Sequence, residues 1–158
     1  MIARNMCYPI KKSGRIVHET KLCTACGICE LVCSLYHEGV CSQSLSRITL
    51  KREPLAGNFR VDTCRQCLAP SCYFSCPVNA IAIDNRVGAS FIVKEKCVGC
   101  LACAKSCPLN EEGTIIRFNA EKKICFKCDL CKGRDRGPIC VEACPWNALR
   151  YLEVSKHE

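Results

Sequence analysis

The sequence has few of the motifs on which most enzymes depend. It contains no G-x-G-x-x-G loop and no P-loop, so no site for a dinucleotide or ATP is recognisable. Its three histidines, His18, His37 and His157, lie outside any H-E-x-x-H run, and we expect each to be a surface residue or a hydrogen-bonded structural one. Without a nucleophile beside a base, or an open metal position, we expect a protein that is not an enzyme.

A long apolar segment and a targeting signal are also missing from the sequence. Residues 1–6 lead into polar sequence with no apolar signal region, twin-arginine pair or stop-transfer stretch. We therefore expect a cytoplasmic protein that does not insert into a membrane. Disulfides need an oxidising compartment, and an odd number of cysteines would leave one thiol over. A disulfide framework is accordingly not favoured.

Cysteine, by contrast, is abundant, with 19 among 158 residues. Such a fraction is otherwise typical of short disulfide-rich scaffolds. Most of these cysteines belong to one pattern that occurs four times, and three of the four copies end in proline. The four motifs are Cys23-x2-Cys26-x2-Cys29-x3-Cys33, Cys64-x2-Cys67-x4-Cys72-x3-Cys76-Pro77, Cys97-x2-Cys100-x2-Cys103-x3-Cys107-Pro108 and Cys128-x2-Cys131-x8-Cys140-x3-Cys144-Pro145.

The spacing within a motif suits iron–sulfur ligation. Three cysteines separated by two residues let the backbone curl around one cube, and the fourth follows at what we expect to be the start of a short helix. In two-cluster ferredoxins this fourth cysteine binds the neighbouring cluster. The first and third motifs match that run, although Ser34 replaces the proline in the first. The sequence predicts four [4Fe-4S] clusters, and chain order leaves open whether the motifs pair first with second or first with fourth.

The fourth motif has two possible registers, because Cys125, Cys128 and Cys131 also form a C-x2-C-x2-C run. The pair Cys140 and Cys144, followed by proline, repeats the ending of the other motifs. Pairing it with Cys128 and Cys131 needs an insertion of eight residues, whereas Cys125 and Cys128 would need eleven. We favour Cys128 and Cys131, and expect Cys125 to be a buried thiol or one that lies just outside the ligands.

Two further cysteines, Cys7 and Cys41, stand alone, and we expect both to be small buried apolar residues. Tetrahedral zinc is the main alternative for the motif cysteines. Zinc sites usually separate their cysteine pairs by about a dozen residues or more, and they need neither a third cysteine two residues on nor a fourth before proline. The pattern therefore favours iron–sulfur clusters.

The formal charge of +8 would ordinarily suggest nucleic acid or an acidic membrane as a partner. An oxidised [4Fe-4S] cluster with four thiolates carries about −2, so four clusters contribute about −8. The loaded protein would then be nearly neutral. Because the sequence also lacks a nucleic-acid-binding signature, we expect no nucleic acid partner.

The segments that flank the motifs predict an α+β fold with short strands and short helices. We expect one compact body over residues 1–158, built from two halves like bacterial ferredoxins, with little regular secondary structure and no long helix. Residues rich in β-branched and aromatic side chains predict strands. These runs are residues 47–50, 81–83, 91–93, 115–118 and 149–152.

With these motifs, residues 20–152 resemble the four-cluster ferredoxin-like subunits of multi-subunit oxidoreductases, the family of the iron–sulfur subunit of dimethyl sulfoxide reductase. In that family the first motif pairs with the fourth and the second with the third. The resemblance implies a half A of about residues 15–50 and 120–152, and a half B of about 58–118. It implies four ligand sets: Cys23, Cys26, Cys29 and Cys144 (first); Cys128, Cys131, Cys140 and Cys33 (second); Cys64, Cys67, Cys72 and Cys107 (third); Cys97, Cys100, Cys103 and Cys76 (fourth).

Residues 33–39, CSLYHEG, and 45–48, LSRI, are most similar to the small subunits of tungsten aldehyde oxidoreductases and their relatives, which include tungsten benzoyl-CoA reductases. This resemblance implies a hetero-oligomer with a large catalytic subunit that carries a tungsten or molybdenum pterin. The chain would relay electrons between that subunit and a ferredoxin, another soluble carrier or a flavin subunit. A formate dehydrogenase, hydrogenase or carbon monoxide dehydrogenase is the alternative partner, and a structural zinc or regulatory iron–sulfur module is the alternative class.

A basic segment in the eight-residue insertion is the remaining feature. It contains Lys132, Arg134 and Arg136. The simpler interpretation is a solvated loop whose charge balances that of the clusters. The alternative is a docking surface for an acidic partner.

Overall fold

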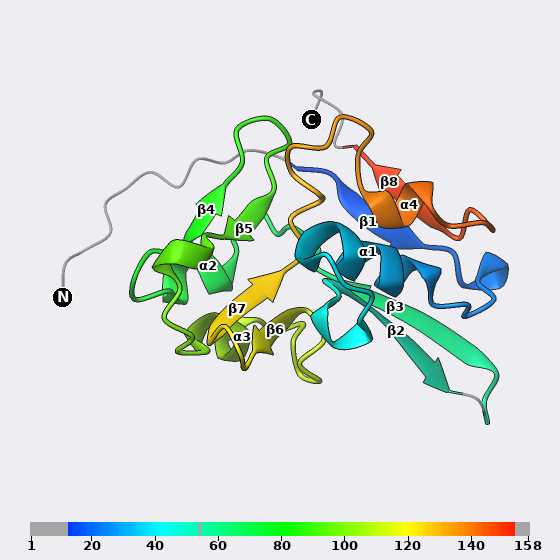
Figure 1. The fold of residues 1–158 in the computed structure, drawn as a ribbon, viewed down its shortest axis with the longest axis horizontal. Helices are drawn as coiled ribbons and strands as arrows, with labels where there is room; N and C mark the ends of the chain where they lie inside the picture. The colour runs from blue at the N-terminus through cyan, green and yellow to red at the C-terminus, as the bar shows by residue number, and fades with distance from the viewer. Residues whose placement is uncertain (1–12, 54, 154–158) are drawn as a thin grey trace.

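The computed structural model describes residues 13–53 and 55–153, and it confirms the expected α+β fold of short elements (Figure 1). Its strands are β1 (Arg15–His18), β2 (Ile48–Glu53), β3 (Asn58–Thr63), β4 (Ile81–Ile83), β5 (Ser90–Ile92), β6 (Ile116–Asn119), β7 (Ile124–Lys127) and β8 (Leu149–Leu152). Its helices are α1 (Ile28–Glu38), α2 (Ser71–Ser75), α3 (Ala102–Ser106) and α4 (Ile139–Glu142), with single 3-10 turns at Thr20–Leu22, Gln43–Leu45 and Lys94–Lys96.

The strands form antiparallel pairs rather than one large sheet. The pairs are β1 with β8, β2 with β3, β4 with β5 and β6 with β7. The β1–β8 pair joins the two ends of the described chain, with Arg15 opposite Leu152 and His18 opposite Leu149. Each of the five predicted runs contributes a strand, whereas β1, β3 and β7 were not predicted.

The helices differ from the sequence expectation in where the fourth cysteine lies and in the length of α1. The fourth cysteine of a motif does not begin a helix: Cys76 and Cys107 follow the last residues of α2 and α3, and Cys144 follows α4 by two residues. The cause is the proline after each of these cysteines, which disfavours helical backbone at the preceding residue. In the first motif Ser34 replaces that proline, and α1 continues through Cys33 to Glu38. The result is an eleven-residue helix, longer than the short helices we expected.

In Figure 1, α1, α4, β1 and β8 lie on one side of the molecule, and α2, α3, β4, β5, β6 and β7 lie on the other. Helix α1 contacts α4, and α2 contacts α3, where the hydroxyl oxygens of Ser75 and Ser106 are 2.7 Å apart. The β6–β7 hairpin occupies residues 116–127 and so crosses the boundary between the two predicted halves. Within the described residues, no helix has the length and apolar character to span a bilayer.

The core of the molecule is rich in sulfur. Cysteines make up almost half of the buried apolar residues, beside aliphatic side chains such as Ile48, Ile81 and Leu149. Helices and strands this short cannot bury enough apolar surface for a conventional core. The cysteine positions therefore determine how the interior is filled.

Candidate metal centre

The four motifs share one backbone feature that the sequence did not reveal. The residue directly before the second cysteine has a positive φ in each motif: Ala25 at 56°, Gln66 at 52°, Gly99 at 67° and Leu130 at 56°. For a residue other than glycine this conformation costs about 1–2 kcal/mol, and such strain tends to persist at functional sites. The shared turn indicates that each C-x2-C pair is shaped for the same ligand.

This turn bears on the register of the fourth motif. Leu130 precedes Cys131 and has the left-handed turn, so Cys128-x2-Cys131 repeats the geometry of the other motifs. In the competing pair, Cys125 and Cys128, the equivalent residue is Lys127, which lies in strand β7. The backbone therefore supports the pair Cys128 and Cys131.

The structure brings the first predicted ligand set together around a small pocket. Its lining includes Cys23, Cys26 and Cys29 from the start of α1 and Cys144 from the far end of the chain. His18 lines the same pocket, and its Nε2 is buried without a hydrogen-bond partner among the described protein atoms. A sulfide of a bound cluster would accept a hydrogen bond from that atom. No motif in the sequence indicates this role of His18.

The fourth predicted set lines a second pocket. Cys97, Cys100 and Cys103 of the third motif meet Cys76 of the second motif there, next to Cys125. The backbone N–H of Cys125 donates to Cys97 Sγ at 3.3 Å, and the Cys125 side chain is hydrogen-bonded to Cys103. Cys125 is thus a buried thiol just outside a ligand set, as we expected. The set beside it is the fourth, whose ligands come from the second and third motifs.

The second predicted set lies in the interior. Burial raises the pKa of the Cys140 thiol well above its ordinary value, and Cys128, Cys33 and Cys131 are close enough to raise it further. All four of these cysteines are buried.

The third predicted set comes together at the ends of β3 and α3. Burial raises the pKa of Cys72 to about 11, with Cys64 and Cys107 as neighbouring charges. Cys107 in turn lies near Cys64 and Cys67. Cys67 is exposed, whereas Cys64 and Cys72 are buried.

The residues of these four sites fit iron–sulfur clusters by their chemistry. Each site offers four cysteine thiols, the donor set of a [4Fe-4S] cluster, and only beside the second set, among the described residues, does a carboxylate, that of Asp129, also lie close to a ligand sulfur. Because burial disfavours thiolates, their charge needs metal and hydrogen-bond donors to offset it. Backbone N–H groups supply such donors to at least one sulfur in every motif: Ala25 to Cys23 (3.4 Å), Ala80 to Cys76 (3.2 Å), Cys125 to Cys97 (3.3 Å) and Leu130 to Cys128 (3.5 Å).

Charged side chains surround the second set. His37 Nε2 is 3.7 Å from Cys131 Sγ and 3.5 Å from Asp129 Oδ1, and its side chain is only 8% exposed. Burial is the main cause that lowers the pKa of His37 to about 4, so the imidazole is neutral at neutral pH. Arg47 forms an ion pair of 2.8 Å with Asp129 and approaches Glu38 at 3.7 Å. His37, Asp129 and Cys131 also form a potential metal site, but Cys131 already belongs to the second set.

The remaining predicted residues are placed as follows. Cys41 is exposed, so the expectation of a buried residue was wrong. It follows the left-handed cap Gly39 closely and lies in the exposed turn after α1. Cys7 and His157 lie outside the described residues.

The basic segment is largely paired within the molecule. Arg134 donates to the Gly137 carbonyl at 2.8 Å and pairs with Glu142, which Arg136 also approaches at 3.2 Å. Lys132 Nζ lies 4.2 Å from the centre of the Phe91 ring. The side chain of Arg136 is nevertheless 77% exposed.

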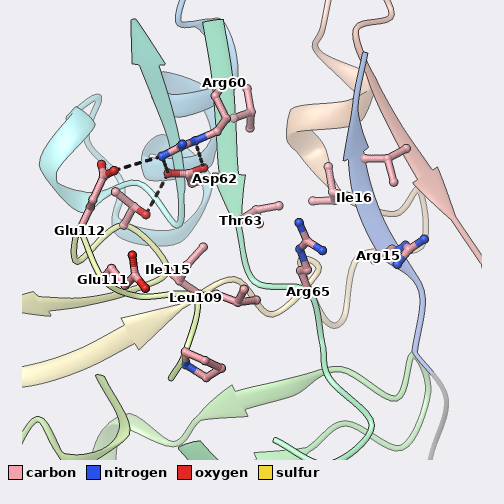
Figure 2. Close-up of a pocket in the computed structure, with 14 residues that line it drawn as sticks. Arg15, Ile16, Arg60, Asp62, Thr63, Arg65, Leu109, Glu111, Glu112 and Ile115 are labelled. Carbon is pink, nitrogen blue, oxygen red and sulfur yellow. Dashed lines mark hydrogen bonds and ion pairs between the residues drawn. The ribbon is translucent and has the colours of Figure 1, made fainter. Parts of the chain in front are cut away.

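A surface cleft of about 610 Å³ opens between β1, β3 and the segment after Cys107 (Figure 2). Figure 2 shows the Arg60 guanidinium held between Asp62 and Glu112, at 2.8 and 3.4 Å. Arg15 and Arg65 also line the cleft. Its opposing charges nearly cancel, so the cleft has no strong preference for an anion or a cation.

Comparison with known proteins agrees with this chemistry. A family model described as a 4Fe-4S dicluster domain matches residues 55–154. The chain is 40% identical over 122 residues to the aliphatic sulfonate oxidoreductase, polyferredoxin-like subunit, of Pyrococcus furiosus. The matched region covers 77% of this chain and 66% of that protein. It is 30% identical over 159 residues to the electron transport protein HydN of Escherichia coli, which covers 90% of each chain.

A solved structure shares the fold. It is the active site complex BamBC of benzoyl coenzyme A reductase with 1,5 dienoyl-CoA, with a TM-score of 0.55 and 20% identity over 94% of this chain and 80% of that chain. At this identity the likeness concerns the fold alone.

Proposed function

Because the chain belongs to the 4Fe-4S dicluster domain family, we propose that it holds four [4Fe-4S] clusters and relays electrons as a non-catalytic subunit of an oxidoreductase complex. The clusters would supply one-electron redox chemistry at low potential, as all-cysteine ligation favours. The observation that carries the proposal is the meeting of four cysteines from two motifs at each of four sites. The proposed sets are Cys23, Cys26, Cys29 and Cys144; Cys128, Cys131, Cys140 and Cys33; Cys64, Cys67, Cys72 and Cys107; and Cys97, Cys100, Cys103 and Cys76.

The four proposed sites follow one another in a line. Cys29 of the first set is close enough to Cys140 of the second to raise its pKa. In the same way, Cys64 of the third set raises the pKa of Cys128 of the second. Cys103 of the fourth set likewise raises the pKa of Cys72 of the third. An electron could therefore pass from the first site to the fourth in three short steps.

The two ends of this line reach the surface. Cys26 of the first set and Cys100 of the fourth are exposed, whereas every cysteine of the second set is buried. Large apolar side chains are exposed beside each end: Trp146, 54% exposed, lines the pocket of the first cysteine set, and Val98, 63% exposed, lines the pocket of the fourth set. We propose that the two ends face different electron partners.

The contacts between helices support the pairing of motifs in the proposed halves, while the β2–β3 hairpin joins the two halves. Half A would combine the first and fourth motifs, which α1, α4 and the β1–β8 pair bring together. Half B would combine the second and third motifs through α2 and α3. Placing the division after Lys127 keeps the β6–β7 hairpin whole within half B.

For the partner, we propose a large catalytic subunit with a tungsten or molybdenum pterin, of the aldehyde oxidoreductase type. The similarity to a polyferredoxin-like oxidoreductase subunit supports such an assembly. A ferredoxin or a flavin subunit would exchange electrons at the other end. The similarity to HydN, an electron transport protein, is the observation that keeps a different oxidoreductase as the alternative.

The basic segment remains a proposed docking surface for an acidic partner. Arg136 would carry most of the contact because its side chain is the most exposed, whereas Arg134 holds the loop to Glu142. An Arg136→Glu variant should weaken binding to the partner without changing the iron content.

The test is anaerobic purification of the chain from its native host under conditions that keep complexes intact. We expect a brown protein with about 16 irons per chain and a large subunit that co-purifies with tungsten or molybdenum. A colourless preparation with zinc in place of iron would refute the cluster proposal. A partner without either metal would refute the assignment of the partner alone.

A further inference from the structure

A buried lysine lies between the second and third cysteine sets. Lys127 is the last residue of β7, is only 2% exposed, and is among the largest fully buried side chains of the described molecule. Its Nζ is 3.3 Å from Cys64 Sγ of the third set and 3.4 Å from the carbonyl oxygen of Cys128, a residue of the second set. This placement could not be predicted from the sequence, since lysine is among the residues least often fully buried.

The ammonium is held in a fixed position. It donates to the Ser90 carbonyl oxygen at 2.6 Å and contacts the Ser90 hydroxyl at 2.9 Å. Ser90 is fixed in turn by Gln66 Oε1, which accepts from its N–H at 2.8 Å and its hydroxyl at 2.9 Å. Gln66 Nε2 donates to the Cys128 carbonyl at 2.9 Å and closes the network.

Within residues 13–53 and 55–153, Lys127 forms no ion pair with an acidic side chain. The partners of its Nζ are a thiol sulfur, two carbonyl oxygens and a hydroxyl oxygen. A buried charge without an opposite charge is costly, so the sulfur atoms around Lys127 must supply the balance. The cation beside the second set differs in this respect, because Arg47 is matched by Asp129 and Glu38.

We propose that Lys127 is a fixed positive charge that makes the third site, formed by Cys64, Cys67, Cys72 and Cys107, the one with the highest reduction potential in the line. This inference rests on the proposed function and extends it to how electrons are distributed. An added electron makes a cluster more negative, and a buried cation at hydrogen-bond distance stabilises that state more than a solvated one does. Electrons would therefore collect at an interior position of the line and leave it when a partner docks.

The experiment is a redox titration of the holoprotein followed by electron paramagnetic resonance, in wild type and in Lys127→Met. Methionine keeps an unbranched side chain, shorter by one atom, and removes its charge. We expect the highest midpoint potential to fall so that this site's preference for the electron drops about tenfold or more, which is about 59 mV for one electron. Lys96→Met is the control: Lys96 directly precedes Cys97 but is exposed, so solvent screens its charge and no comparable shift should occur.

A second measurement decides the matter if Lys127→Met fails to fold or loses iron. Three exposed cysteines, Cys26, Cys67 and Cys100, represent the first, third and fourth sets, and a serine at each should alter the signal of its own cluster. We expect Cys67→Ser to change the signal with the highest potential. If Cys26→Ser or Cys100→Ser changes that signal instead, or if all three leave it unaltered, Lys127 does not have this role.

Iron content and reduction potentials distinguish a wrong proposed function from a wrong role for Lys127. The proposed function is wrong if the wild-type protein holds far fewer than about 16 irons or gives no reducible signal. The proposed role of Lys127 is wrong if the fully loaded protein has reduction potentials that do not change in Lys127→Met.

Discussion

Replacing Cys125 and Cys140 with alanine, one at a time, tests the proposed ligands of the fourth motif. Cys125 is 1% exposed in strand β7, and the N–H that it donates to Cys97 belongs to the backbone, which alanine retains. Cys125→Ala removes one sulfur atom from a packed site, so we expect a loss of about 1 kcal/mol in the free energy of unfolding. The iron content should stay at about 16 per chain.

Cys140→Ala removes a proposed ligand of the second set. Cys128, Cys131 and Cys33 would then lack a fourth thiolate, and we expect the iron content to fall to about 12 per chain with a corresponding loss of absorbance near 400 nm. Iron analysis and visible spectra of anaerobically purified protein give both values. Cys41→Ala is the matched control, because Cys41 is exposed and should change neither.

The opposite result would refute the register. If Cys125→Ala lost a cluster while Cys140→Ala kept about 16 irons, the motif would use Cys125 and Cys128, and the turn at Leu130 would have another cause.

Two further predictions concern folding. Gly99→Ala should reduce the iron content and the stability, because a Cβ on Gly99 would clash with the Lys123 carbonyl oxygen at a φ of 67°. Gly113→Ala is the control: Gly113 has a φ of 68° and open space around it, so the change should cost only about 1–2 kcal/mol in the free energy of unfolding. Thermal unfolding and iron analysis compare the two variants. Removal of iron with a chelator under anaerobic conditions should leave the chain largely unfolded by circular dichroism and by the loss of a cooperative thermal transition, because the buried cysteines would lose the charges that balance them. A cooperative transition in iron-free protein would contradict that expectation.

The sequence predicted those parts of the fold that depend on local residue types. Ile81–Ile83 and Leu149–Leu152 are strands because β-branched and apolar residues dominate them. The prediction that the fourth cysteine begins a helix was wrong, because the proline after Cys76 and Cys107 disfavours helical backbone at these cysteines. Strand β3, Asn58–Thr63, was missed because Asn58 and Asp62 belong to residue types that are uncommon in strands, and its strand state depends on pairing with β2.

The surroundings of the cysteines could not be predicted, because they arise from distant segments. His37 and Lys127 look like ordinary surface residues in the sequence. Their burial results from contacts with Asp129, Cys131, Cys64 and Ser90, which are far away along the chain. The left-handed residues Ala25, Gln66 and Leu130 were equally hidden, since none is a glycine or an asparagine.

Whether all four cysteine sets hold redox-active clusters is decided by a reductive titration of the anaerobically purified chain. Stepwise addition of a low-potential reductant, followed by visible absorbance and electron paramagnetic resonance, counts the electrons that one chain accepts. We expect four, one for each cysteine set. Uptake of two electrons would mean that two of the four sites hold no redox-active cluster and would contradict the account.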